Sequence, residues 1–132
     1  MPIKSSQTLV AEALKEVKTI TADDALKLSN DDICTLIDIR EKGELDNSGR
    51  VENSNHIPRG MLEFWLDPRS SYYKENKFDQ NKKMILFCAL GMRSALSTKS
   101  LVDMGFKNVA HVKGGFDALK NCGLEVVKKE KK

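Results

Sequence analysis

Residues 84–94 read MILFCALGMRS, and the fold class can be inferred from this segment. An uninterrupted apolar run, Met84–Phe87, ends at Cys88, and a short loop that contains Gly91 leads into a segment with helical patterning. A strand that is apolar at successive positions is covered on both faces, as in a parallel sheet. The thiol of Cys88 is therefore expected at the carboxyl end of a buried strand, facing N–H groups at a helix start. Those groups favour the thiolate, the nucleophilic form of cysteine.

The rest of the chain alternates helical and strand patterns. We expect helices over 6–17, 61–67, 92–104 and 116–121, and a further short helix that Thr21 caps. We expect strands over 18–20, 33–39, 56–58, 84–87 and 109–112. The stretch 43–55 is a loop or a short helix plus loop. The positions expected to face inward are Val10, Ala13, Leu14 and Val17 in the first helix, and Ala95, Thr98, Leu101 and Val102 in the helix after Cys88. This order predicts an α/β fold, a small parallel sheet of about five strands with helices on both faces.

Composition limits the partners. The chain has 132 residues and a net charge of +3, with four lysines among its last five residues, so we expect one domain, a frayed basic tail and no nucleic-acid partner. No apolar run has the length of a signal peptide or a membrane span, which favours a cytoplasmic protein without membrane contact. The three cysteines form no CxxC pair and combine with His56 and His111 at no zinc-ligand spacing, so neither metal nor cofactor is expected.

Four motifs in a consistent order resemble the rhodanese (sulfurtransferase) family. They are LIDIRE at 36–41, HIPRG at 56–60, the strand–Cys-x-x-Gly-x-Arg-Ser–helix pattern at 84–104, and KGGF at 113–116. The resemblance covers residues 18–124 and implies a rhodanese-like domain over 18–127. It leaves residues 1–17 as a helical extension and 128–132 as the tail.

The resemblance implies a sulfur transfer in two steps. Cys88 would accept a sulfane sulfur from a small-molecule or protein donor, and a thiol or cyanide acceptor would then remove it from the Cys88 persulfide. The persulfide-binding positions would be the loop residues Ala89, Leu90, Gly91, Met92, Arg93 and Ser94. Hydrogen bonds to a charged group contribute about 1.5–3 kcal/mol each, against about 0.3–1 kcal/mol for a helix dipole. The loop amides should therefore dominate the stabilisation of the sulfur anion.

The loop also bears on the substrate. Cysteine phosphatases and arsenate reductases use Cys-x5-Arg, one residue longer than the Cys88–Arg93 spacing, which makes them a weaker alternative. Because Ala89, Leu90 and Met92 are uncharged, a dianionic donor would depend on Arg93 and Arg59. We therefore expect an organic or protein persulfide as donor rather than thiosulfate, with an apolar rim formed by Phe64 and Trp65.

Other residues have structural interpretations. Arg93 either supplies charge to the site or clamps the loop to Glu41 or Glu44, and Asp38 and Arg40 are expected to form a buried ion pair. Glu41 and His56 would support adjacent loops. Cys34 should be an inert core thiol, whereas Cys122 could be exposed. A non-enzymatic sulfur-relay or protein-binding module remains an alternative to an enzyme.

Overall fold

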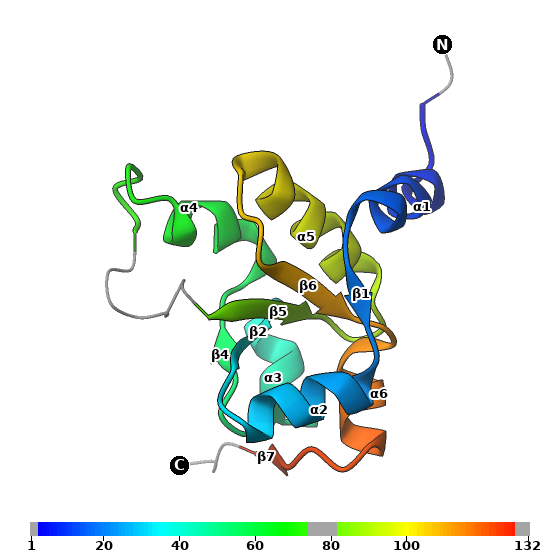
Figure 1. Cartoon of the computed structure of the whole chain (residues 1–132), viewed down its shortest axis with the longest axis vertical. Helices are drawn as coiled ribbons and strands as arrows, with labels where there is room; N and C mark the ends of the chain where they lie inside the picture. The colour runs from blue at the N-terminus through cyan, green and yellow to red at the C-terminus, as the bar shows by residue number, and fades with distance from the viewer. Residues whose placement is uncertain (1–2, 74–81, 129–132) are drawn as a thin grey trace.

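The computed structural model describes residues 3–73 and 82–128 and is built around a five-stranded parallel sheet (Figure 1). The strand order is β1-β6-β5-β2-β4. Its strands are β1 (Thr19–Ile20), β2 (Cys34–Asp38), β4 (Asn55–His56), β5 (Lys83–Phe87) and β6 (Val109–Val112). The predicted α/β sheet is therefore confirmed. Residues 1–2, residues 74–81 and most of the expected basic tail, residues 129–132, lie outside the described residues.

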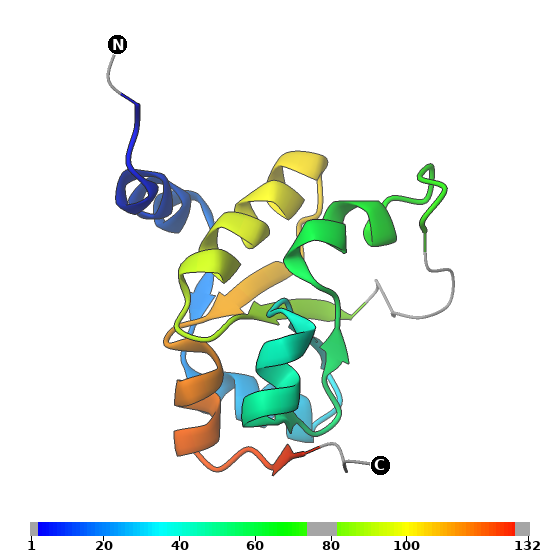
Figure 2. The ribbon, with the colours of Figure 1, turned by 180° about the vertical axis from the view of Figure 1, so that it is seen from behind.

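Helices cover both faces of the sheet (Figures 1 and 2). One face carries α1 (Ser6–Glu16), α4 (Leu62–Leu66) and α5 (Met92–Met104), and the other carries α2 (Ala22–Asn30), α3 (Lys42–Ser48) and α6 (Gly115–Asn121). A 3-10 turn, η1 (Arg59–Met61), precedes α4, and β3 (Arg50–Val51) pairs antiparallel with β7 (Val126–Val127). The stretch 43–55 thus contains most of α3, then β3 and the start of β4.

The apolar core has two parts, one on each face of the sheet. Successive residues of a strand point to opposite faces, so in β5 Ile85 and Phe87 join one cluster, whereas Met84 and Leu86 join the other. All four side chains are buried, as the uninterrupted apolar run predicts. Cys34 lies in the cluster beneath α2 and α6, where burial raises the pKa of its thiol.

Local signals explain where the helices begin and end. The hydroxyl of Ser5 accepts from the N–H of Thr8 at the start of α1, and Thr21 caps α2 in the same way. Gly91 and Gly105 flank α5 in left-handed backbone conformations, with φ of 113° and 108°. Residues with a Cβ rarely adopt such angles, and the predicted end of this helix at residue 104 is confirmed.

Three apolar side chains are more exposed than the periodicity predicts: Ile33, Leu14 and Val102. Ile33 precedes the first strand residue, Cys34, and so lies outside the sheet. In the helices, Ala13 and Leu101 are buried, and the next residue along is rotated by about 100° away from that face. The inward orientation expected of Leu14 and Val102 is therefore wrong.

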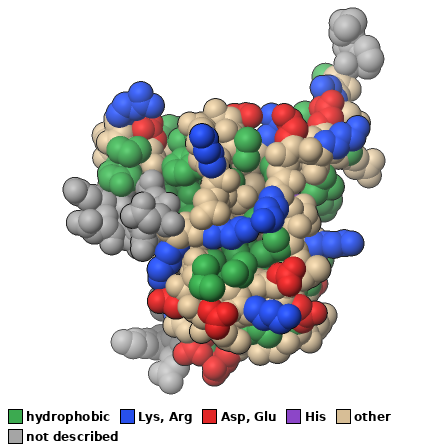
Figure 3. Space-filling model, in the orientation of Figure 1, with side chains coloured by type: hydrophobic (Ala, Val, Ile, Leu, Met, Phe, Trp, Pro, Cys, Tyr) green, Lys and Arg blue, Asp and Glu red, His purple; other side chains and the backbone are tan. Residues whose placement is uncertain are grey.

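Charged side chains of both signs are interspersed over the face that carries α1, β1 and α2, where apolar side chains also reach the surface (Figure 3). Within the described residues, no helix is both long and apolar enough to cross a bilayer.

Candidate active site

Cys88 lies directly after β5, a central strand that pairs with β2 on one side and β6 on the other. Its side chain is only 1% exposed. The carboxyl ends of parallel strands are where ligands bind in open α/β sheets. This location is the one that the sequence predicts for the thiol.

The loop after Cys88 turns two backbone N–H groups toward the sulfur. The N–H of Gly91 donates to Cys88 Sγ at 3.1 Å, and that of Ser94 donates at 3.4 Å. The Ser94 hydroxyl oxygen lies 3.7 Å from the same sulfur. Of the six loop positions expected to bind the persulfide, residues 89–94, these two direct their amides at the sulfur within the described part of the chain. The site can therefore hold a sulfur anion with fixed donors.

A chain of hydrogen bonds continues from Ser94 into the core. Ser94 Oγ lies 3.0 Å from His111 Nδ1, and His111 Nε2 lies 2.9 Å from Thr19 Oγ1. His111 is 2% exposed, and this burial lowers the pKa of its imidazole. Because the Ser94 hydroxyl also donates to the Gly91 carbonyl, its oxygen is free to accept from Nδ1–H while Nε2 accepts from Thr19. A neutral imidazole therefore orients the hydroxyl beside the sulfur.

Sequence reasoning missed this part of the site. The sequence pattern raised His111 only as a possible zinc ligand, which its spacing from the cysteines did not support, and gave Thr19 no role. The two residues are direct partners across the parallel pair β1–β6. A sequence signal was available, since both residues lie in predicted strands. The strand order, which brings β1 beside β6, was not predicted.

The amino end of α6 holds the carbonyl side of the loop. Phe116 N–H donates to the Cys88 carbonyl at 2.7 Å, and Asp117 N–H donates to the Ala89 carbonyl at 3.4 Å. Gly115 has φ of 58°, and a Cβ at this position would lie 2.3 Å from the Cys88 carbonyl oxygen. Only glycine allows α6 and the loop to approach this closely.

The predicted ion pair between Asp38 and Arg40 is present and buried. The Arg40 guanidinium binds the Asp38 carboxylate at 2.8 Å, and its remaining donors reach Ser48 Oγ and the Gly49 carbonyl. The guanidinium also lies 4.0 Å from the centre of the Phe116 ring, a cation–π contact. The pair therefore supports the residue whose N–H binds the Cys88 carbonyl.

His56 and Glu41 lie next to this ion pair. His56 Nε2 lies 2.7 Å from the Arg40 carbonyl oxygen, to which it donates. The N–H of Glu41 donates to Glu44 Oε2 at the start of α3, an arrangement that fixes the helix end. Both contacts fit the supporting positions expected of these residues.

Glu41 and Glu44 are the two partners predicted for Arg93, and in the structure Arg93 binds Glu44. Its guanidinium donates to both oxygens of Glu44 at 2.8 Å, which joins the start of α5 to α3. Glu44 raises the pKa of Arg93, and in return Arg93 lowers the pKa of Glu44 to about 2. Cys88 makes a smaller contribution to the raised pKa of Arg93, so the charge of Arg93 lies close to the site. The clamp and the nearby charge are thus both present in one side chain.

The structure does not join Arg59 and Phe64 to the loop. Arg59 binds Glu63 at 2.8 Å and the Ser100 hydroxyl at 3.4 Å, and Phe64 packs edge-on against Tyr72. In the described ranges, no hydrogen bond or ring contact links either residue to residues 88–94. Trp65, in contrast, packs against the core cluster that contains Cys88. A donor-binding role for Arg59 and a rim of Phe64 and Trp65 stay predictions.

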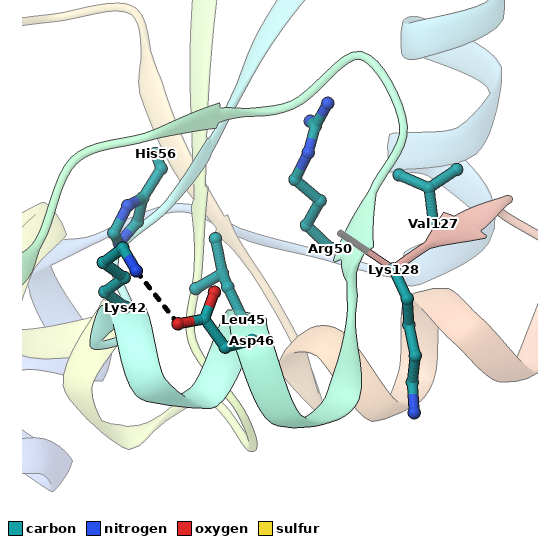
Figure 4. Close-up of a pocket in the computed structure, with 7 residues that line it drawn as sticks. All are labelled: Lys42, Leu45, Asp46, Arg50, His56, Val127 and Lys128. Atoms are coloured by element: carbon teal, nitrogen blue, oxygen red, sulfur yellow. Dashed lines mark hydrogen bonds and ion pairs between the residues drawn. The ribbon is translucent and has the colours of Figure 1, made fainter. Parts of the chain in front are cut away.

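Away from the Cys88 loop, a hollow of about 350 Å³ lies between α3 and the β3–β7 pair (Figure 4). Lys42 is bound to Asp46 at 3.0 Å. Arg50 and Lys128 point in opposite directions, so the positive charges drawn in Figure 4 do not converge on one point. The described residues contain no cluster of three metal-binding side chains here or elsewhere.

Cys122 is partly buried, and its thiol donates to the Leu119 carbonyl.

Together, the fold and the site describe a single α/β domain with a buried cysteine held by loop amides. The family model of the rhodanese-like domain matches residues 21–122. The chain therefore belongs to the rhodanese-like family.

Two solved structures and a curated relative extend this likeness. A protein of unknown function from Rhodopseudomonas palustris, described as a possible tyrosine phosphatase, is 38% identical, with a TM-score of 0.87 over 96% of this chain and 99% of its own. The homodimeric polysulfide-sulfur transferase of Wolinella succinogenes is 31% identical, with a TM-score of 0.73 over 94% and 88%. Rhodanese-like domain-containing protein 17 of Arabidopsis thaliana is 32% identical over 83% of this chain and 73% of its own length. Two other curated relatives are longer, and the chain spans 58% and 33% of them.

Proposed function

We propose that this protein is a sulfurtransferase of the rhodanese type that carries a sulfane sulfur on Cys88. The observation that carries the proposal is the pair of N–H donors, from Gly91 and Ser94, that point at a buried cysteine sulfur at a strand end. A covalent carrier needs an ionised nucleophile and a site that stabilises the charged product. The same two amides can donate to a sulfur anion before and after the transfer. The name of the Wolinella relative, a polysulfide-sulfur transferase, supports the same chemistry.

The reaction proceeds by two nucleophilic displacements at sulfur. The Cys88 thiolate attacks the outer sulfur of a donor, a new S–S bond forms, and the former partner of that sulfur leaves with the bonding electron pair. A thiolate or cyanide then attacks the outer sulfur of the Cys88 persulfide. That S–S bond breaks, and the Cys88 thiolate is restored. The exchange needs neither an outside oxidant nor a cofactor.

The donors of the site act at each stage of this exchange. In the thiol form, the S–H group of Cys88 donates to Ser94 Oγ, and the Ser94 hydroxyl donates to the Gly91 carbonyl. Once the thiol proton leaves, the hydroxyl can turn and donate to the sulfur anion. His111 keeps the oxygen of this hydroxyl in place during the change.

The spacing of the loop argues against phosphate chemistry, although the Rhodopseudomonas relative is described as a possible tyrosine phosphatase. Four residues separate Cys88 from Arg93, where cysteine phosphatases have five. The Arg93 guanidinium also donates to both carboxylate oxygens of Glu44, so these donors are already engaged and would have to leave Glu44 to bind a phosphate. A phosphatase or arsenate reductase is thus the weaker alternative.

An organic or protein persulfide fits the site better than thiosulfate does. The loop interior holds no cation, and the Arg93 charge is already offset by Glu44. A dianion would lose its hydration without gaining a matching charge. We expect faster sulfur loading from glutathione persulfide than from thiosulfate, and clearly faster loading from thiosulfate would contradict this choice of donor.

The alternative is a relay that passes sulfur between proteins without turnover of small molecules. Exposed side chains at the loop favour it. Leu90 and Met92 are 59% and 56% exposed and could contact a partner protein. Steady-state turnover with a free donor and cyanide separates the two proposals. An enzyme should turn over repeatedly, and Cys88→Ser should abolish this activity. A relay should instead keep its persulfide in the presence of cyanide or free thiols.

A further inference from the structure

A groove of about 370 Å³ lies directly beside the Cys88 loop. The loop residues Leu90, Gly91 and Met92 form one wall, and Val10 and Leu14 of α1 form the other. Helix α1 reaches this place because it packs beside α5 on the same face of the sheet (Figures 1 and 2). The volume is in the range of small-molecule sites.

The two walls present apolar side chains to solvent. Leu14 is 44% exposed, and Leu90 and Met92 are more than half exposed. Exposed apolar surface from two elements, gathered around one hollow, is a feature of binding sites rather than of scattered surface residues. Leu14 lines the groove because it points outward, which the helical pattern did not predict.

Lys113 is the one charged residue that lines the groove. It lies directly after β6 and forms no ion pair with any residue in the ranges 3–73 and 82–128. The groove thus combines apolar walls with one positive charge. Its complement is a molecule with an apolar body and a single negative group.

The groove is connected to the reacting sulfur through two residues. Gly91 lines it and donates its N–H to Cys88 Sγ. His111 lines it as well and binds Ser94, the other residue that contacts the sulfur. A molecule in the groove would thus lie against the same loop that holds the sulfur.

We propose that this groove binds the organic part of the sulfur donor, a persulfide with an aliphatic body and one carboxylate or sulfonate. The proposal rests on the sulfurtransferase function above. The Cys88 thiolate attacks the outer sulfur of R–S–SH and forms the Cys88 persulfide. The R–S⁻ thiolate leaves with the bonding pair, and the groove holds the R group in both states. By microscopic reversibility, R–S⁻ attacking the Cys88 persulfide uses the same groove.

Unloading of the Cys88 persulfide by thiols tests this proposal. The probes are 3-mercaptopropionate, 8-mercaptooctanoate and 8-mercaptooctanol, with cyanide as an acceptor that does not need the groove. We expect 8-mercaptooctanoate to exceed 3-mercaptopropionate in kcat/KM by about tenfold, because part of its longer chain is buried. It should exceed the neutral alcohol by about threefold, because only the acid can pair with Lys113.

Paired variants separate the groove from general effects. Leu14→Ser should reduce the preference for the long chain at least threefold, whereas Leu9→Ser, in the same helix and also 44% exposed, should leave it unchanged. Lys113→Gln should remove the preference for the acid over the alcohol, and Lys120→Gln, an exposed lysine outside the groove lining, should retain it.

The outcomes distinguish this proposal from the function on which it rests. Equal unloading by the short and long thiols, or equal effects of Leu14→Ser and Leu9→Ser, would overturn the groove while cyanide still releases sulfur from Cys88. If no donor loads sulfur onto Cys88, the proposed function and the groove both fail.

Discussion

The two sides of the Cys88 loop differ sharply in how they are held. On the inner side, Ser94 and the Cys88 carbonyl contact buried groups, His111 and the amino end of α6. On the outer side, Leu90 and Met92 are exposed, and the ion pair of Arg93 is in contact with solvent. The inner contacts have little freedom because each polar group is buried and satisfied. The outer contacts can change without disturbing the core.

We infer from this difference that the two sides of the loop, residues 88–94, have different roles. The inner side fixes the sulfur and its donors, which any sulfur-transfer reaction would require. The outer side selects which molecule approaches. Substitutions on the inner side should therefore affect stability and reactivity together, whereas those on the outer side should affect selectivity or make small changes.

Gly115→Ala should have the largest effect, because the new Cβ would collide with the Cys88 and Ala89 backbone. Overpacking costs about 1–3 kcal/mol, and a positive φ at a residue with a Cβ costs about 1–3 kcal/mol more. We expect the free energy of unfolding to fall by about 3 kcal/mol and turnover to fall about a hundredfold as the loop shifts. Denaturant unfolding and steady-state turnover measure these effects.

Gly123→Ala is the matched control for this substitution. Gly123 also has a positive φ, 106°, but no atom lies within 4 Å of its would-be Cβ. The Gly123→Ala variant should lose only the free energy of unfolding that the positive φ costs, and it should keep full turnover. If both variants lose the same stability and activity, close approach to Cys88 is not the reason for the glycine.

Ser94→Ala should have a smaller effect on turnover than Gly115→Ala. It also leaves the buried His111 Nδ1 without its partner, so the free energy of unfolding should fall by about 1 kcal/mol or more. The variant lacks a hydroxyl donor to the anion, and a hydrogen bond to a charged group contributes about 1.5 kcal/mol at the low end of its range. The rate of Cys88 alkylation by iodoacetamide rises with the thiolate fraction. Its midpoint should move upward by about one pH unit, because the hydrogen bond that the anion loses is stronger than the S–H donation that the thiol loses.

Ser97→Ala is the control for this variant, since Ser97 is also buried in α5 but donates to the Arg93 carbonyl. Its alkylation curve should match that of the wild type. A midpoint that stays in place or falls in Ser94→Ala would contradict the role of the hydroxyl.

Glu44→Gln, on the outer side, should have the smallest effect. Glu44 and Arg93 are 36% and 39% exposed, so solvent screening limits their pair to below about 1 kcal/mol. Because the folded pKa of Glu44 is lowered from 4.5 to about 2, its stabilisation is complete above pH 4.5 and is lost as pH falls toward 2. Unfolding free energies of both proteins should therefore converge between pH 5 and pH 2. A gap that widens on acidification would contradict this assignment.

The local parts of the fold could be predicted from sequence because their causes are local. The apolar run Met84–Phe87, the cap at Thr21 and the end of α5 at Met104 each depend on a few neighbouring residues. The location of Cys88 follows from the strand that precedes it. The choice of Glu44 over Glu41 as partner of Arg93 needed the structure, because it depends on how α3 lies against α5.

The parts that escaped prediction depend on which strands are neighbours. Thr19 and His111 are 92 residues apart, and their contact exists only because β1 adds to the sheet next to β6. The groove likewise needs α1 to pack beside α5. Periodicity gave Leu14 a buried position because it cannot show where one helix face meets the edge of another element.

The mass of the intact protein after treatment with a sulfur donor tests the central claim most directly. The protein is treated with glutathione persulfide with Cys34 and Cys122 left in place. Peptide mapping then locates the added sulfur. We predict a gain of one sulfur atom on Cys88 that cyanide removes, and no such gain in Cys88→Ser. An unchanged mass, or sulfur found only on Cys34 or Cys122, would contradict the account.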